Sequence, residues 1–210
     1  MLDKNTLVII MCKAPVEGKV KTRLMSKYTA AEATAWHKAM ASTVIERAKR
    51  LFQHVWLAAD DVTHPFFEPF GLPMYAQGEG DLGARMSFLM EQASQAGFEK
   101  LLFLGTDSPH MLDKRLLQAS AALDDYDVVL GAVEDGGYDL IAMNRAYPAL
   151  FSGITWSSEH VLQQSVDIAQ EQGLNYLVLE ESFDVDTPDM LHRAQQLGWQ
   201  VPKMANIISR

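Results

Sequence analysis

Four of the five charged side chains between Lys13 and Arg23 are positive, in a chain whose net charge is −9. Lys19 and Lys21 supply the other two cations, and we call the segment 13–23 the basic loop. Arginine offers phosphate a planar pair of donors, and lysine offers it a compact point charge. Cations gathered on one loop of an acidic protein therefore predict the binding of a phosphate-bearing small molecule.

The basic loop directly follows the apolar run Leu7–Met11, which is typical of a strand buried on both faces. Ligands of open α/β sheets bind at the carboxyl ends of the strands, which is where this loop is expected. A solvated surface loop is the alternative. A Walker A loop is excluded, because Gly18-Lys19 lacks the upstream glycine and Val20 stands where Ser or Thr is needed.

Two acidic segments are candidates for holding a divalent cation. Asp107, in the segment Gly-Thr-Asp-Ser-Pro, ends a predicted strand, and hard cations such as Mg²⁺ take one or two carboxylates together with substrate phosphates. Asp186 or its neighbour Asp184 is the candidate for the second carboxylate. The alternatives are local, since Asp107 could cap the helix that follows, and Asp186 or Thr187 could cap a helix that has Pro188 in its first turn.

The segment Glu-Asp-Gly-Gly-Tyr-Asp, residues 134–139, is a third candidate site. Gly136 and Gly137 would let the backbone approach a substrate closely, with Tyr138 beside them. Asp135 is the candidate for a group that orients an acceptor hydroxyl or acts as a general base. A tight turn between two strands would explain the same glycines without any ligand.

Two further residues are candidates for substrate binding. Arg85 lies in a segment that opens a helix, and a helix N-terminus favours anions. Asp81 in that segment is equally suited to a plain helix cap. Trp156 either lines the substrate pocket or belongs to the core.

The pattern of apolar residues predicts the elements that position these side chains. Strands are expected at residues 7–12, 54–59, 74–77, 100–105, 127–133, 138–143 and 176–179. Helices are expected at residues 29–52, 82–96, 113–123, 157–172 and 188–197, the first with Thr29 and Glu32 as a capping box. This alternation predicts a single domain over residues 1–210, with a mostly parallel sheet and helices on both faces. The strands on either side of residues 134–137 are expected to be joined by a hairpin-like or β-bend connection.

Composition excludes several function classes. The chain is 48% hydrophobic and acidic overall, which favours a packed core and disfavours nucleic-acid binding. No apolar run approaches the roughly 20 residues of a membrane span, so we expect a cytoplasmic protein with no membrane partner. The single cysteine, Cys12, excludes an intrachain disulfide and fits a reducing compartment. The oligomeric state stays open.

Four motifs in the same order resemble one family over nearly the whole chain. They begin at Lys13, Gly105, Asp135 and Asp184, and the first and last read Lys-x-Pro-x-x-Gly-x-Val-Lys-Thr-Arg-Leu and Asp-Val-Asp-Thr-Pro-Asp. Together they are similar to the DUF2064, or glycosyltransferase A-like, proteins of bacteria, whose members often accompany radical-SAM and arsenosugar genes. This places the chain in the nucleotide-diphospho-sugar transferase superfamily, near the guanylyltransferases that act on molybdopterin and phospholactate.

The resemblance implies a GT-A fold, which is a Rossmann-like three-layer sandwich, and a nucleotide-bound donor. It also implies that Asp107 and Asp186 are the metal acids for Mg²⁺ or Mn²⁺, with Lys13, Lys21 and Arg23 at the phosphates. Two segments of this chain differ from the motifs of related transferases, and the differences bear on which reaction is expected. The segment 105–109 has one acid where many glycosyltransferases have Asp-x-Asp, and the basic loop lacks the Gly-rich form of sugar nucleotidyltransferases.

Three functions are therefore expected as alternatives. The first is a metal-dependent transferase that uses a nucleotide-diphospho-sugar to glycosylate a small acceptor. The second is a nucleotidylyltransferase that joins a nucleoside triphosphate to a phosphorylated small molecule and releases pyrophosphate. The third is a catalytically inactive nucleotide-binding protein on the same fold.

Overall fold

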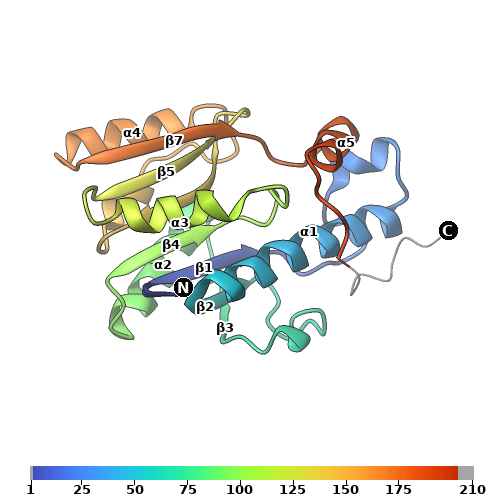
Figure 1. Cartoon of the computed structure of the whole chain (residues 1–210), viewed down its shortest axis with the longest axis horizontal. Helices are drawn as coiled ribbons and strands as arrows, with labels where there is room; N and C mark the ends of the chain where they lie inside the picture. The colour runs from blue at the N-terminus through green and yellow to red at the C-terminus, as the bar shows by residue number, and fades with distance from the viewer. Residues whose placement is uncertain (1, 203–210) are drawn as a thin grey trace.

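Seven strands form one sheet in the order β3-β2-β1-β4-β6-β5-β7 (Figure 1). The strands are β1 (Asp3–Cys12), β2 (Phe52–Ala59), β3 (Met74–Ala76), β4 (Lys100–Leu104), β5 (Val128–Val133), β6 (Tyr138–Met143) and β7 (Tyr176–Ser182). Neighbouring strands are parallel except where β6 pairs with β4 and β5. The expected hairpin-like connection between the fifth and sixth strands is thereby confirmed. The computed structural model describes residues 2–202.

Helices cover both faces of this sheet. They are α1 (Ala30–Leu51), α2 (Leu82–Gln95), α3 (Asp113–Ala122), α4 (Val161–Glu171) and α5 (Pro188–Gln196), with short 3-10 helices η1 (Thr22–Ser26), η2 (Glu68–Phe70) and η3 (Pro148–Phe151). Helices α1 and α3 pack on one face, and α2 and α4 pack on the other. The α/β three-layer architecture is therefore as predicted, and Figure 1 shows α1 and α3 in front of the sheet.

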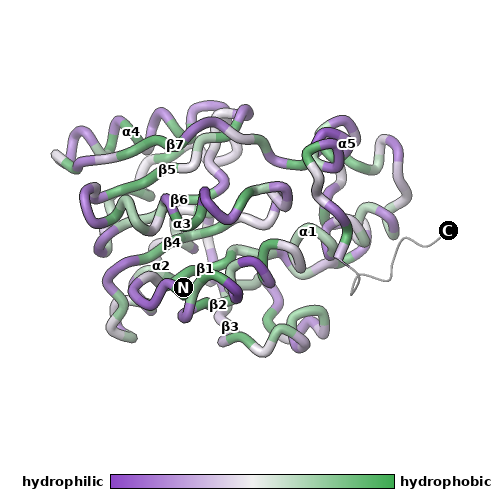
Figure 2. The backbone as a smooth tube through the Cα atoms, viewed as in Figure 1, coloured by the Kyte–Doolittle hydropathy of each residue, from purple (hydrophilic) through white to green (hydrophobic). Residues whose placement is uncertain are grey.

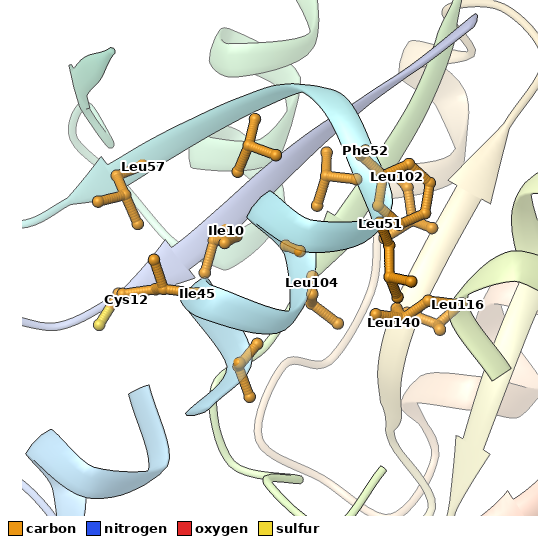
Figure 3. Close-up of a cluster of buried hydrophobic side chains, with 14 of the residues drawn as sticks. Ile10, Cys12, Ile45, Leu51, Phe52, Leu57, Leu102, Leu104, Leu116 and Leu140 are labelled. Atoms are coloured by element: carbon orange, nitrogen blue, oxygen red, sulfur yellow. The ribbon is translucent and has the colours of Figure 1, made fainter. Parts of the chain in front are cut away.

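Alternation along the strands divides the core into two layers. In β1, Val8 and Ile10 belong to the cluster under α1 and α3, whereas Leu7 and Ile9 belong to the cluster under α2 and α4. Figure 3 shows the first cluster, where Ile45 of α1 lies beside Ile10. Both faces of β1 are thus apolar, which is why the sequence shows a continuous run there (Figure 2).

A third apolar cluster lies beyond the carboxyl end of β1. It joins Leu24 of η1 and Trp36 of α1 to Val185 and Leu191, which lie before and within α5. Figure 1 shows α5 and the start of α1 side by side at this end of the molecule. This cluster holds the chain after β1 against the chain after β7, and so brings two candidate segments together.

Three element boundaries differ from the prediction by three residues or more. Strand β1 begins at Asp3 and not at residue 7, because Asp3 pairs with Phe52 across an irregularity in the register. The expected helix from residue 157 begins at Val161, because Ser157 has a left-handed φ of 63° and Ser158 donates from Oγ to the Thr155 carbonyl at 2.6 Å. Strand β7 runs on to Ser182, because its pairing with β5 continues past an irregularity in the register. The capping box at Thr29 and Glu32 is confirmed. Among residues 2–202, no helix combines the length and the apolar character that a membrane crossing needs.

Candidate functional site

Lys21 lies at the centre of the candidate site, between two carboxylates. Its Nζ is 2.8 Å from Asp107 Oδ1 and 2.9 Å from Asp186 Oδ1, and it donates to the Val185 carbonyl at 2.8 Å. Only 4% of the Lys21 side chain is exposed. Arg23 adds a second cation, with Nη1 at 3.2 Å from Asp186 Oδ2. Four of the predicted residues, distant in the sequence, thus form one ion-pair network.

The fold explains why these segments meet. The basic loop follows β1 and Asp107 follows β4, and these two strands are parallel neighbours, so their carboxyl ends lie at the same edge. Asp186 arrives from the chain between β7 and α5, where the Val185 amide donates to the Asp107 carbonyl at 2.8 Å. Thr187, not Asp186, caps α5, so the Asp186 carboxylate is available for the ion pairs.

The charges of Lys21 and Asp107 stabilise each other. Burial opposes a charge on Lys21, but Asp107 and Asp186 outweigh it and raise the pKa of the ammonium above its usual range. Burial likewise opposes ionisation of Asp107, yet Lys21, with smaller help from His37 and Lys13, lowers the pKa of that carboxyl. At neutral pH the site therefore holds an ammonium between carboxylates.

Asp184 lies in the same acidic segment but in a different electrostatic environment. Burial, followed by repulsion from Asp107, raises its pKa to about 7. Ser108 Oγ lies 2.6 Å from Asp184 Oδ1 and 3.1 Å from the Phe183 carbonyl oxygen. A hydroxyl has one hydrogen, so both contacts are hydrogen bonds at the same time when Asp184 carries the proton.

Replacing Asp184 with Asn tests this environment. Between about pH 4 and 7 the folded protein keeps a proton on Asp184 that the unfolded chain releases, so this group's contribution to stability falls as pH rises. We expect Asp184→Asn to raise Tm at pH 8 more than at pH 5, by roughly 2–4 °C for each kcal/mol relieved. Thermal unfolding with a metal chelator measures this, and exposed Asp125→Asn is the control. A gain independent of pH would contradict it.

Two residues that we did not single out in the sequence hold the basic loop in place. Asp60 Oδ1, just after β2, accepts from the Ala14 amide at 2.6 Å, and His37 Nε2 of α1 lies 2.9 Å from the Lys13 carbonyl oxygen. Asp60 follows an apolar strand as Asp107 does, so the same signal could have found it. Lys13 and Lys19 have exposed side chains on this anchored loop.

Arg85 is connected to the end of β1 through one intermediate residue. Its Nη1 donates to Gln77 Oε1 at 3.3 Å, and Gln77 Nε2 donates to the carbonyls of Ala58 at 2.9 Å and Cys12 at 3.4 Å. Asp81 caps α2 by accepting from the Ala84 amide. Arg85 thus lies near the carboxyl ends of β1 and β2, whereas Cys12 is a buried core residue.

The hairpin segment around Gly136 and Gly137 packs against the chain before α4. The Gly136 carbonyl accepts from the Leu162 amide at 2.8 Å, and Asp135 Oδ1 accepts from the Gly137 amide at 2.9 Å. Among residues 2–202, no hydrogen bond or ion pair joins Asp135 to Asp107 or Asp186. The positive φ of Gly136, 83°, and the close approach of the Glu159 backbone account for that glycine, whereas a substrate role for Gly137 or Asp135 stays a prediction.

Tyr138 and Trp156 form an edge-to-face pair, with ring centroids 6.5 Å apart. Both pack against the core under α2 and α4, and Trp156 Nε1 is buried without a hydrogen-bond partner among the described residues 2–202. A Cβ at Gly83 would lie 2.7 Å from that nitrogen, so the glycine in α2 admits the indole. Trp156 is therefore part of the core wall, and its contact with a substrate stays a prediction.

The donor set suits a hard divalent cation. Within residues 2–202 there is no group of three or more Asp, Glu, His or Cys side chains placed to hold a metal ion. Mg²⁺ usually needs only one or two protein carboxylates, because water and substrate phosphates complete its coordination. Asp107 and Asp186 already converge on one positive charge, that of Lys21, so they fit Mg²⁺ or Mn²⁺.

Solved structures share this arrangement of strands and helices. The chain is 25% identical to a candidate nucleotide-diphospho-sugar transferase from Desulfovibrio desulfuricans G20, with a TM-score of 0.82 over 92% of this chain and 96% of that one. It is 15% identical to CMP:2-keto-3-deoxy-manno-octonic acid synthetase complexed with CTP, with a TM-score of 0.60 over 92% and 98% of the two chains. It is 12% identical to 4-diphosphocytidyl-2C-methyl-D-erythritol synthase from Anaerococcus prevotii DSM 20548, with a TM-score of 0.60 over 93% and 97%.

These likenesses establish the nucleotide-diphospho-sugar transferase fold that the motifs predicted. No curated protein matches the chain. Residues 39–158, more than half of the sequence, match the model of a bacterial family described as an uncharacterized protein conserved in bacteria. The chain therefore belongs to that family, DUF2064, as its four motifs indicated.

Proposed function

We propose that this protein is a metal-dependent transferase that uses a nucleotide-diphospho-sugar donor to glycosylate a small acceptor. The observation that carries this proposal is the convergence of Lys21, Asp107 and Asp186 at the carboxyl edge of the sheet. The fold shared with the candidate nucleotide-diphospho-sugar transferase from Desulfovibrio desulfuricans supports a donor of that class.

The chemistry follows from the charge that develops on the donor. When the sugar leaves, its diphosphate becomes more negative, and cations fixed in advance around it lower the barrier. Lys13, whose side chain is exposed, and Arg23, which is 73% exposed and ion-paired with Asp186, would meet the diphosphate. A Mg²⁺ or Mn²⁺ ion held by Asp107 and Asp186 would supply further stabilisation of the leaving group.

The proposal also assigns roles to predicted residues outside the basic loop. Arg85, at the start of α2, is the candidate for a second contact to the donor phosphates. Gly137 and Tyr138 would border the acceptor, and Asp135 would orient its hydroxyl or accept its proton. Trp156 would support this wall from the core side.

A nucleotidylyltransferase is the second candidate, and two structural likenesses favour it. The synthetase complexed with CTP and the diphosphocytidyl-methylerythritol synthase have the same fold. Release of pyrophosphate from a nucleoside triphosphate also leaves negative charge on a phosphate group, so the same cations would serve. An inactive nucleotide-binding protein is the third candidate.

Replacing Asp107 with Asn tests the proposal directly. We expect nucleotides to raise Tm of the wild type when Mn²⁺ is present, since a ligand at about 100 times its Kd adds roughly 2.7 kcal/mol. The metal-dependent part of that rise should be lost in Asp107→Asn and kept in Asp125→Asn, whose exposed carboxylate is the control. The same rise in Asp107→Asn would refute the metal role.

The identity of the stabilising nucleotide separates the candidate reactions. A larger rise with a nucleoside diphosphate and its sugar than with the triphosphate supports glycosyl transfer and names the base. A rise led by one triphosphate, with pyrophosphate released when a phosphorylated acceptor is added, supports nucleotidyl transfer. Binding without turnover across a broad acceptor panel supports the inactive protein.

A further inference from the structure

We infer that the Lys21 ammonium is a resident counter-cation that a divalent metal must displace from Asp107 and Asp186. Lys21 would then control access to the metal site, in addition to any contact with phosphate. This inference rests on the metal-dependent function proposed above. It does not depend on which nucleotide or acceptor the protein uses.

The first argument is that Lys21 has no N–H group left. An ammonium carries three hydrogens, and Nζ has three acceptors, which are Asp107 Oδ1, Asp186 Oδ1 and the Val185 carbonyl, at 2.8–2.9 Å. A fourth partner such as a donor phosphate cannot bind Lys21 while these three remain. Phosphate binding by Lys21 therefore requires the lysine to leave the carboxylates.

The second argument is that a metal would need the same oxygens. Mg²⁺ binds carboxylate oxygens at roughly 2.0–2.1 Å and does not tolerate an ammonium in the same space. Both carboxylates present to Lys21 an oxygen that metal coordination would use. Among residues 2–202, two carboxylates contact Lys21, so the ammonium and the divalent ion are alternatives, and each offsets the charge of the acidic pair.

The third argument concerns the backbone of Lys21. Its φ of 48° and ψ of 42° are left-handed, and among residues 2–202 only Ser157 is another non-glycine residue with positive φ. Such a conformation is unfavourable for a residue with a Cβ and persists when surrounding contacts fix it. The ion pairs of the buried Lys21 side chain are among the contacts at this position, together with the hydrogen bond from the Leu24 amide to the Lys21 carbonyl. If the ammonium left the carboxylates, the backbone at Lys21 could adopt a more favourable conformation. The free energy gained in this way would offset part of the cost of breaking the Lys21 ion pairs.

The experiment compares Mn²⁺ binding to the wild type and to Lys21→Met without nucleotide, followed by electron paramagnetic resonance of free Mn²⁺. Methionine keeps much of the length and removes the charge. We expect Lys21→Met to bind Mn²⁺ about tenfold more tightly or better, because the competing cation is gone. Lys27→Met removes an exposed cation from the same region and should leave the Mn²⁺ affinity unchanged.

Thermal unfolding of the same variants distinguishes displacement from a purely structural role. Without metal, Lys21→Met should have a lower Tm than the wild type, because Asp107 loses the cation that contacts it and Asp186 keeps only the exposed Arg23 within residues 2–202. Mn²⁺ should restore that Tm, whereas the wild type should respond little. A Tm that stays low with Mn²⁺, or an unchanged Mn²⁺ affinity, would show that Lys21 is only a structural link and would overturn the inference.

A measurement on the wild type avoids reliance on a folded variant. Acetylation followed by mass spectrometry should find Lys21 protected, as its 4% exposed side chain requires, and labelled once Mn²⁺ is saturating. Protection of Lys21 while Mn²⁺ is bound would overturn the inference. The proposed function is tested separately with CDP, GDP and UDP in the presence of Mn²⁺. It fails if these nucleotides raise the Tm of the wild type no more than they raise the Tm of Asp107→Asn.

Discussion

Arg115→Met is expected to destabilise the protein by about 3–5 kcal/mol at pH 8, because it leaves a buried carboxylate without its partner. Arg115 Nε lies 2.9 Å from Asp139 Oδ2, and the two side chains are 12% and 2% exposed. The guanidinium also donates to the carbonyls of Ala132 at 3.1 Å and Glu180 at 2.5 Å. One side chain of α3 thus fixes β5, β6 and β7 to one another.

The cost of Arg115→Met should depend on pH. Burial raises the pKa of Asp139 to about 6 even though Arg115 opposes that shift. Without Arg115 the pKa of Asp139 rises further, so the folded variant keeps a proton that the unfolded chain releases above about pH 4. Its stability therefore falls as pH rises, and the loss relative to the wild type should be smaller at pH 5 than at pH 8.

Urea unfolding at the two pH values measures this loss. The double variant with Asp139→Asn has no buried charge at this pair, so it should be more stable at pH 8 than Arg115→Met and should lack the part of the pH dependence that Asp139 causes. An equal loss at pH 5 and pH 8 for Arg115→Met would assign the effect to the carbonyl contacts at Ala132 and Glu180. Since Glu180 lies near the end of β7, the pair also positions the chain that leads to Asp186.

The sequence alone could predict the elements and the edge of the sheet, but not the partners of each cation. Asp107 was recognisable because it is an acidic residue that follows an apolar strand. The same pattern predicts that it lies at the carboxyl edge of the sheet. Lys21 was expected at a phosphate, yet it contacts Asp186 and Val185, which are 165 and 164 residues away. No local pattern encodes that contact, because the third apolar cluster creates it.

Arg115 shows a second limit of sequence analysis. On a polar helix beside Lys114 it looks like one cation of a solvated face. It lies beside Gly131, after which the pairing of β5 with β6 and β7 shifts register, and a Cβ at Gly131 would lie 2.2 Å from Asp139 Oδ1 and 3.0 Å from Arg115 Nη2. Register shifts depend on the partner strands, so the alternation of residues within β5 could not predict the buried pair.

Gly136→Ala is expected to cost more than about 3 kcal/mol, the second large effect. Gly136 has a φ of +83°, and an added Cβ would lie 2.1 Å from the Glu159 carbonyl oxygen. Left-handed backbone costs a residue with a Cβ roughly 1–2 kcal/mol, and the clash with rigid backbone adds to it. The hydrogen bond from the Leu162 amide to the Gly136 carbonyl should be lost as the two segments separate.

Gly153→Ala is the matched control for this prediction. Gly153 has a φ of +76°, and in the part of the chain that the structure describes no atom lies within 4 Å of the position that an added Cβ would take. Its substitution therefore measures the backbone cost alone. Urea unfolding of both variants should show a clearly larger loss for Gly136→Ala. Equal losses would mean that the chain before α4 yields easily and that close packing is not what requires glycine at 136.

Comparison of Gly136 with Gly137 separates a packing role of the hairpin from a role in substrate binding. Gly137 has no left-handed φ, and a Cβ there would meet Asp135 Oδ1 at 3.1 Å, a contact that a small shift relieves. Gly137→Ala should therefore leave stability nearly unchanged while it moves the Asp135 carboxylate. If the hairpin contacts the acceptor, this variant loses turnover but keeps the rise in Tm with nucleotide and Mn²⁺. If turnover is unchanged although the Asp135 carboxylate has moved, the hairpin does not contact the acceptor. Both glycines then have a structural role only.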